Sequence, residues 1–164
     1  MNLFYSKTEE FKFANITIHG RLDLYNIINI KFEDVNVEGS FYFDKDLNYI
    51  SKNYGSKVYY EYLKYIYDIS ITMSKVIYKG LGYYNSYCIS LRGNVIINDS
   101  QFYGGTSCEM NIINYFGDNY YNMDVSNMYC NGMYINKCFY MENVPSVTIY
   151  SSTFENGASI NSSG

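Results

Sequence analysis

Two aspartates in neighbouring copies of a repeat are the first candidates for chemistry in this chain. Asp99 and Asp124 lie one and two residues before equivalent serines of that repeat, so a folded repeat could bring their carboxylates together. Glycoside hydrolysis uses two carboxylates about 5–10 Å apart. We favour the simpler interpretation, in which both side chains are solvated on the outside of a sheet.

The basic residues provide little for catalysis. A lyase would need acidic side chains to hold calcium and an arginine or lysine as the base, but neither of the two arginines, Arg21 and Arg92, is expected to lie in an acidic cluster. His19 is the only histidine; it directly precedes Gly20 and is expected at a turn. No phosphate-binding loop, nucleophile elbow or zinc-protease motif occurs. The sequence therefore predicts a protein that is not an enzyme and has no catalytic residue, metal site or cofactor.

Four serines repeat at a single spacing, and this repeat dominates the chain. Ser74, Ser100, Ser126 and Ser152 are evenly spaced. Apolar residues lie five and three positions before each serine and two positions after it, and a glycine follows five or six positions later. The four columns are Ile69, Val95, Tyr121 and Val147; Ile71, Ile97, Met123 and Ile149; Val76, Phe102, Met128 and Phe154; and Gly80, Gly105, Gly132 and Gly157. A fixed period in the twenties is typical of a solenoid.

The alternation within each repeat predicts strands. Most residues between the apolar positions are polar, which is the period of two expected for a strand with one buried face. The alternation changes phase just before the serine, so we expect two short strands joined by a bend, as in one coil of a parallel β-helix. Residues 87–91, 110–115 and 138–141 are candidate third strands. The serines are expected inside the corner, where stacked hydroxyls can bond to one another in a ladder.

Residues 147–160 carry a resemblance to a known class of proteins. The segment reads Val-Thr-Ile-Tyr-Ser-Ser-Thr-Phe-Glu-Asn-Gly-Ala-Ser-Ile and resembles the right-handed β-helix repeats of polymorphic outer-membrane-type and other adhesin-like surface proteins, which share a pectate-lyase-like superfold. The resemblance covers roughly residues 69–160. It implies an all-β, single-stranded right-handed parallel β-helix, at the cell surface or outside the cell, and each coil would span one serine interval, about 26 residues.

The N-terminal part contains a more distant copy of the same pattern. Residues 28–39 match residues 69–80 position for position, with Glu33 in the place of Ser74. These two positions lie more than one period apart, which leaves room for an insertion, and a solenoid places insertions in a loop. Tyr59, Tyr62 and Leu63 begin a helical spacing that predicts a short helix near residues 56–67, although tyrosines also favour strands. We therefore expect one domain over 1–164, with irregular coils in 1–43, an insertion in 44–68 and regular coils in 69–164, and the chain reads as a fragment of a longer protein.

Composition excludes several classes of partner. The net charge of −4 and the lack of a basic stripe argue against nucleic acid. No apolar run is long enough for a membrane span. The four cysteines allow two disulfides in any of three connectivities, or free thiols in the interior. These cysteines are Cys88, Cys108, Cys130 and Cys138.

Surface chemistry supplies two further expectations. The sequons at Asn15, Asn98 and Asn161 are candidate glycosylation sites, and Asn98 is expected to point outward. Tyr103 and Tyr129 share a phase in successive coils, so they are expected to stack on the outside of the sheet. There they would contact a glycan or a partner, or only stabilise the sheet.

The leading hypothesis is a non-enzymatic, extracellular structural or adhesive glycoprotein. Because the last repeat ends without a polar cap, we expect it to associate with itself or with other β-helix segments of the same protein, as a filament or surface-layer component assembling end to end. The alternative is a carbohydrate-active β-helix enzyme or a tailspike-like protein that binds or depolymerises polysaccharide. A third hypothesis is a plain carbohydrate-binding module.

Overall fold

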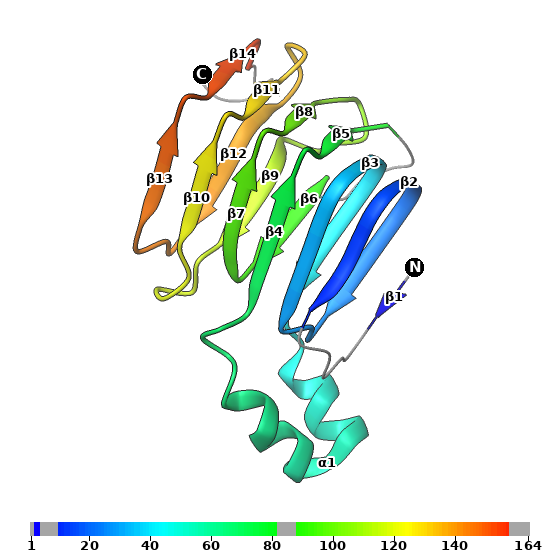
Figure 1. The fold of residues 1–164 in the computed structure, drawn as a ribbon, viewed down its shortest axis with the longest axis vertical. Coiled ribbons are helices and arrows are strands. Elements are labelled where there is room, and N and C mark those ends of the chain that lie inside the picture. The colour runs from blue at the N-terminus through cyan, green and yellow to red at the C-terminus, as the bar shows by residue number, and fades with distance from the viewer. Residues whose placement is uncertain (1, 4–9, 82–87, 158–164) are drawn as a thin grey trace.

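The computed structural model describes residues 2–3, 10–81 and 88–157, and these form a mostly β fold with one helix. Figure 1 shows a large sheet curled into a half-barrel, with the helix at one end. All described strand pairs are parallel. The elements are β1 (Asn2–Leu3), β2 (Phe11–Tyr25), β3 (Asn29–Asp44), α1 (Leu47–Leu63), β4 (Ser70–Ser74), β5 (Ile77–Lys79), β6 (Ile89–Arg92), β7 (Asn94–Asn98), β8 (Gln101–Tyr103), β9 (Asn111–Phe116), β10 (Met123–Ser126), β11 (Tyr129–Asn131), β12 (Lys137–Glu142), β13 (Val147–Tyr150) and β14 (Thr153–Glu155).

Successive passes of the chain pair in three rows. Row 1 contains the first part of β2 and of β3, then β4, β7, β10 and β13. Row 2 contains the middle of β2 and of β3, then β5, β8, β11 and β14. Row 3 contains β1, the last part of β2 and of β3, then β6, β9 and β12. The predicted third strands in 110–115 and 138–141 are therefore present as β9 and β12, and β6 covers the described part of the prediction in 87–91.

The core lies on the inner side of these rows. Alternate residues along each strand point inward, as the period of two predicts. Ile30, Ile71, Val95 and Met123 are paired neighbours in row 1, and all four are buried. Row 2 contributes Val37, Tyr78 and Phe102 in the same way. Each coil therefore adds one layer of side chains to a continuous apolar core.

The paired positions do not keep the even spacing of the serines. Ile71 pairs with Val95, Val95 with Met123 and Met123 with Val147, so a short interval, a long interval and another short interval follow one another. A short and a long interval between paired residues add up to twice the spacing between successive serines. The serines can therefore be evenly spaced although the paired positions are not. The interval before β4 is longer still, and Glu33 pairs with Ser74 as the alignment of 28–39 with 69–80 predicted.

The predicted ladder of four serines in one column is therefore wrong. Ser74 and Ser126 both pair with Asn98, at the end of row 1. Ser100 and Ser152 instead lie on the far side of the corner that leads to row 2, next to Val76 and Met128. Because coil length alternates while serine spacing does not, the serine falls alternately before and after the corner.

The first corner has its own repeating signature. One residue in each coil adopts a positive φ of 50–53° immediately after the row 1 strand. This column consists of Asn15, Asp34, Lys75, Asp99, Asn127 and Ser151. Left-handed residues are uncommon outside glycine, so six in register mark the same sharp bend repeated from coil to coil.

Glycines form the second corner, between rows 2 and 3. The residues that follow equivalent row 2 strands are Gly39, Gly80, Gly104 and Gly132. A Cβ on Gly39 would lie 2.0 Å from the carbonyl oxygen of Gly20, so only glycine fits there. The predicted glycine column is correct at Gly80 and Gly132. At Gly105 and Gly157 the prediction is off by one residue. The register aligns Gly132 with Gly104 and with Asn156, the residues just before them.

Helix α1 fills the predicted insertion. The Asp46 side chain caps the helix by accepting a hydrogen bond from the Tyr49 amide at 2.9 Å. Gly55 interrupts the helix with φ 78° and ψ 170°, so it consists of two shorter segments. The predicted helix in 56–67 corresponds to the second segment, and the first was missed. Ile50 and Tyr62 are buried and fix the helix against the rest of the protein.

His19 is expected at a turn, and it directly precedes the second corner at Gly20, whose φ is 100°. It lies within β2, which continues through both corners from Phe11 to Tyr25. Its Nδ1 lies 2.9 Å from a carboxylate oxygen of Glu38, the paired residue of β3.

Candidate functional site

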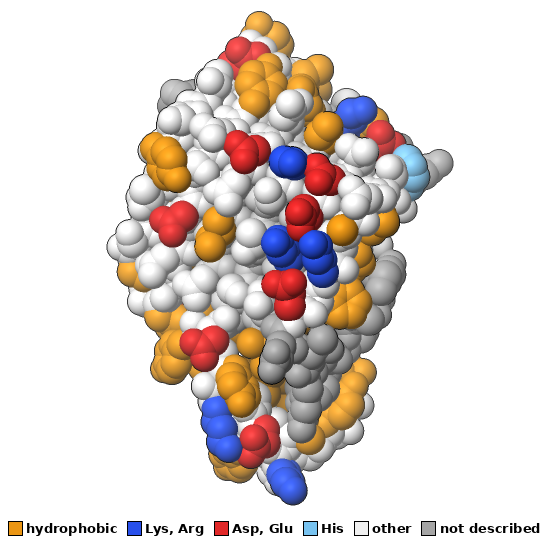
Figure 2. All heavy atoms as spheres, viewed as in Figure 1, with side chains coloured by type: hydrophobic (Ala, Val, Ile, Leu, Met, Phe, Trp, Pro, Cys, Tyr) orange, Lys and Arg blue, Asp and Glu red, His pale blue; other side chains and the backbone are white. Residues whose placement is uncertain are grey.

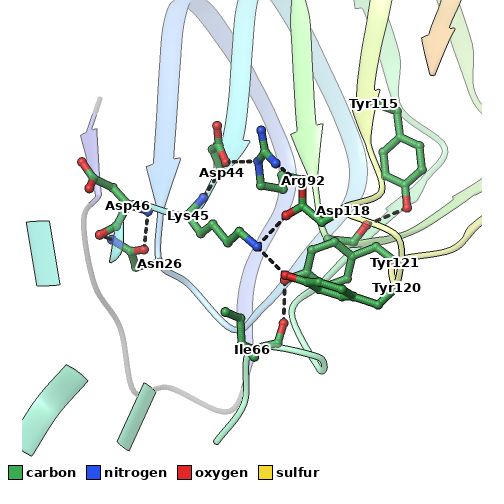
Figure 3. A network of polar contacts seen from close by, with 11 residues as sticks. Asn26, Asp44, Lys45, Asp46, Ile66, Arg92, Tyr115, Asp118, Tyr120 and Tyr121 are labelled. Atoms are coloured by element: carbon green, nitrogen blue, oxygen red, sulfur yellow. Dashed lines mark hydrogen bonds and ion pairs between the residues drawn. The ribbon is translucent and has the colours of Figure 1, made fainter. Parts of the chain in front are cut away.

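A cluster of charged residues lies at the ends of three neighbouring row 3 strands (Figure 3). Asp44 ends β3, Arg92 ends β6, and Asp118 follows β9 by two residues. The Arg92 Nε donates to the Asp44 carboxylate at 2.7 Å, and its Nη1 donates to Asp118. Lys45 approaches Asp118 from the other side, with 2.5 Å between Nζ and Oδ2. We refer to Asp44, Lys45, Arg92 and Asp118 as the charged cluster.

Aromatic rings pack beside the charged cluster. The Lys45 ammonium donates to the Tyr120 hydroxyl at 2.5 Å and lies 5.0 Å from the centre of that ring. The Arg92 guanidinium lies 4.9 Å from the centre of the Phe116 ring. Both contacts have the geometry of cation–π interactions. The Tyr121 hydroxyl donates to the Ile66 carbonyl at 2.5 Å.

These contacts join the two ends of the helical insertion to row 3. Lys45 precedes α1 and Ile66 follows it, while Asp118, Tyr120 and Tyr121 belong to the loop after β9. On the N-terminal side, the Asp46 amide donates to the side-chain oxygen of the buried Asn26 at 2.6 Å. The arrangement therefore holds both ends of α1 against the coils.

The charged cluster is partly buried and balanced in charge. Its side chains are 16–30% exposed, and two carboxylates balance two cations. Burial raises the pKa of Asp44, and the Arg92 guanidinium only partly opposes that effect. Burial also raises the pKa of Tyr121 and of Tyr115. Each carboxylate forms an ion pair, and these pairs connect the ends of β3 and β6 with the loop after β9.

The expectation that Arg92 lies outside any acidic cluster is wrong. Sequence reasoning missed the cluster because its four members come from three separate coils. The signal was present in the third strands: aligning Phe43 with Leu91 would have placed Asp44 beside Arg92, as the register does.

Asp99 and Asp124 do not form a carboxylate pair. The Asp99 carboxylate accepts a hydrogen bond from the Asn127 side chain at 3.0 Å, at the first corner. Asp124 pairs with Ile96 on the neighbouring strand, and Ile96 lies three residues before Asp99. Both side chains are exposed, as expected for solvated surface groups.

A groove of about 600 Å³ runs along the outer face of row 2. Polar side chains from four strands line it beside the exposed apolar residues Ile77, Leu81 and Met133. The complete lining is Thr17, Asn36, Glu38, Ile77, Lys79, Leu81, Gln101, Tyr103, Gly104 and Met133.

Tyr103 lines this groove, and Tyr129 lies next to it. Their ring centres are 5.7 Å apart, so the two tyrosines do come together. The register pairs Tyr129 with Gln101 and Tyr103 with Asn131, which makes the tyrosines diagonal neighbours. The Tyr103 hydroxyl donates to Gln101 at 2.9 Å, and the Tyr129 hydroxyl donates to Glu155.

All four cysteines form disulfides, between Cys88 and Cys108 and between Cys130 and Cys138. Of the sequons, Asn15 is exposed at the first corner. Asn98 is half-buried, and its side-chain oxygen accepts a hydrogen bond from Ser126 at 2.6 Å. Asn161 lies outside the described residues.

The last two strands expose residues that are core elsewhere. Val147, Ile149 and Phe154 are 38%, 42% and 42% exposed, although they occupy inward positions. Their partners in the preceding coil, Met123, Val125 and Cys130, are completely buried. We refer to β13 and β14 as the terminal coil. Among the described strands, β13 pairs only with β10 and β14 only with β11.

Comparison with protein-family models, with curated proteins and with solved structures finds no match for this chain. In the described ranges, no three His, Cys, Asp or Glu residues are grouped to hold a metal ion. The described helix is too short and too polar to cross a membrane.

Proposed function

We propose that this protein is a right-handed parallel β-helix that acts as a non-enzymatic structural or adhesive element, through docking of further β-strands on its terminal coil. The observation that carries this proposal is the exposure of Val147, Ile149 and Phe154 at positions that are buried in the preceding coil. Three rows of parallel strands, two repeating corners and one continuous core support the β-helix.

The terminal coil has the chemistry of a strand acceptor. Each of its strands has one partner among the described strands, and the other edge carries backbone N–H and C=O groups that a further strand could pair with. A strand added there would gain main-chain hydrogen bonds and would cover the three apolar side chains. Because main-chain pairing needs an extended chain, the terminal coil suits a further β-strand better than a flat protein surface.

An extracellular location is part of the proposal. Two disulfides close loops of the chain, and such bonds persist mainly in oxidising compartments. They suit a surface protein that must keep its shape outside the cell.

The docking function is tested by placing charge on the terminal coil. Ile149→Glu and Phe154→Glu each add a carboxylate at an inward position, so we expect either to abolish association of the protein in sedimentation velocity. The control is Thr148→Glu, which adds the same charge on the exposed face of β13. The proposal fails if the native protein stays monomeric at all concentrations, or if the control dissociates it as strongly.

The groove on row 2 favours a second function, binding of a polysaccharide. Tyr103 offers a ring face, and Lys79, Glu38 and Gln101 offer hydrogen bonds along about 600 Å³ of groove. Tyr103→Ala should then lower binding to a glycan array, whereas Tyr140→Ala on row 3 should not. Equal loss in the two variants, or no binding by the native protein, would reject this function.

A further inference from the structure

We infer that the strand acceptor on the terminal coil receives the N-terminal coil of a second copy of this chain, so that copies stack head to tail in one continuous β-helix. This inference rests on the proposed docking function and names its partner. Three features of the two ends support it: their stepped outline, their apolar columns and one pair of charges.

The two ends have complementary steps. Among the described strands, row 3 has one more at the N-terminal end than rows 1 and 2, because β1 pairs with β2 at Asp23 and Leu24. At the C-terminal end, the last described strand of row 3 is β12, whereas rows 1 and 2 continue to β13 and β14. Figure 1 shows β1 and β13 at opposite ends of the sheet. In the described part of the chain, row 3 is therefore one strand longer at the N-terminal end and one strand shorter at the C-terminal end.

The apolar columns also continue across such a junction. Extending the register by one coil places Phe13 of the next copy on Ile149, and Ile18 of the next copy on Phe154. Ile16 at the N-terminal edge is 39% exposed, whereas Val35, its partner in β3, is 1% exposed. The N-terminal edge thus exposes a core position in the same way as the terminal coil does, and one contact covers both.

Charges at the junction are complementary. The same register places Glu155 of one copy beside His19 of the next. His19 is 69% exposed and already contacts Glu38 on its other side at 2.9 Å. An imidazole between two carboxylates can donate a hydrogen bond to one of them, which favours the parallel, head-to-tail arrangement.

Two variants that each block one end test this arrangement. Ile16→Glu blocks the N-terminal edge, and Phe154→Glu blocks the terminal coil. Head-to-tail stacking predicts that each variant alone is monomeric, with association weakened more than about tenfold, and that their equimolar mixture forms dimers and nothing larger. Sedimentation velocity measures the sizes, and circular dichroism checks that both variants are folded. Thr17→Glu is the control, since Thr17 points outward beside Ile16.

Other outcomes separate the two proposals. Dimers of Ile16→Glu alone would show that two terminal coils pair with each other, which overturns the head-to-tail inference and keeps the docking function. Dimers of Phe154→Glu alone would show pairing of two N-terminal edges, which overturns both. A native protein that stays monomeric also overturns both.

Discussion

Serine hydroxyls close the first corner in alternate coils. The Ser100 Oγ accepts a hydrogen bond from the Val76 amide at 3.0 Å and donates to the Asn98 carbonyl at 2.7 Å. Ser152 makes the equivalent pair of bonds, to the Met128 amide at 3.1 Å and the Tyr150 carbonyl at 2.9 Å. The serines therefore satisfy main-chain groups that the bend removes from the sheet.

Replacement of these serines distinguishes the corner role from a serine ladder. Ser100→Ala leaves the buried Val76 amide without its acceptor, so we expect a loss of about 1–3 kcal/mol in the free energy of unfolding. Ser74→Ala, at the half-buried end of β4, should cost less than about 0.5 kcal/mol. Urea denaturation measures both values. A single ladder of four serines would instead give similar losses at the two positions.

The charged cluster makes stability depend on pH through Asp44. Because burial raises its folded-state pKa, the neutral carboxyl favours folding. That contribution is complete below the ordinary pKa of 3.8 and is lost as the pH rises through the higher folded-state pKa. The native protein should therefore lose stability relative to Asp44→Asn between about pH 3 and about pH 7.

The measurement is the urea midpoint of both proteins at the two pH values. Asp124→Asn removes one exposed carboxylate outside the charged cluster and serves as the control. A difference between the native protein and Asp44→Asn that is the same at both pH values would contradict the burial of Asp44.

Residue-level prediction was partly right for the surface tyrosines. Tyr103 and Tyr129 do come together, but as diagonal neighbours and not in the shared column that their serine spacing predicts. The charged cluster was missed, because Asp44, Arg92 and Asp118 meet only once the register of row 3 is known. The serine ladder was predicted wrongly for a related reason. Residues that are evenly spaced in the sequence need not pair with one another in the sheet.

The corners are the elements that determine the shape of a coil. Gly39 has a φ of 136°, and its Cα approaches the chain of the neighbouring coil closely. Gly39→Ala should cost more than about 3 kcal/mol of unfolding free energy or prevent folding, because the added Cβ would overlap the Gly20 carbonyl at 2.0 Å. Gly157→Ala is the matched control, since an added Cβ there meets nothing within 4 Å. Equal thermal stability of the two variants would contradict the close approach.

The disulfides stabilise the later coils. Cys88 and Cys108 are separated by 20 residues, and Cys130 and Cys138 by 8. Closing such loops restricts the unfolded chain and contributes about 3 kcal/mol each, slightly more for the longer loop. We expect reduction to lower the melting temperature, and paired alanine substitution of Cys88 and Cys108 to lower it more than that of Cys130 and Cys138. Melting that is insensitive to reductant would show that these bonds do not hold the native state.

Strands and helix differ in how well the sequence predicts them. The regular strands follow from alternation, and the second half of α1 follows from the spacing of Tyr59, Tyr62 and Leu63. The first half of α1 was missed because Gly55 breaks the periodicity. Disulfide pairing could not be predicted, because the four cysteines occupy different phases of the repeat.

The described surface carries charges of both signs, and the terminal coil exposes apolar side chains. Figure 2 shows positive and negative side chains close together on the face that carries the row 1 strands. Lys12 and Lys31 each contact Glu33, at 2.6 and 3.5 Å. Exposed ion pairs of this kind contribute little to stability. The alternating core predicted the stack of coils, but the equal number of described strands in each row could be seen only from the paired register.

The most direct test of the head-to-tail β-helix is the axial repeat of assembled native protein, measured by cryo-electron microscopy. Each row contains six described strand segments, so one copy should occupy about 29 Å of the axis at about 4.8 Å per strand. We predict unbranched filaments with that repeat and with strands perpendicular to the axis. Dispersed single particles, or closed dimers with no axial repeat, would contradict the account.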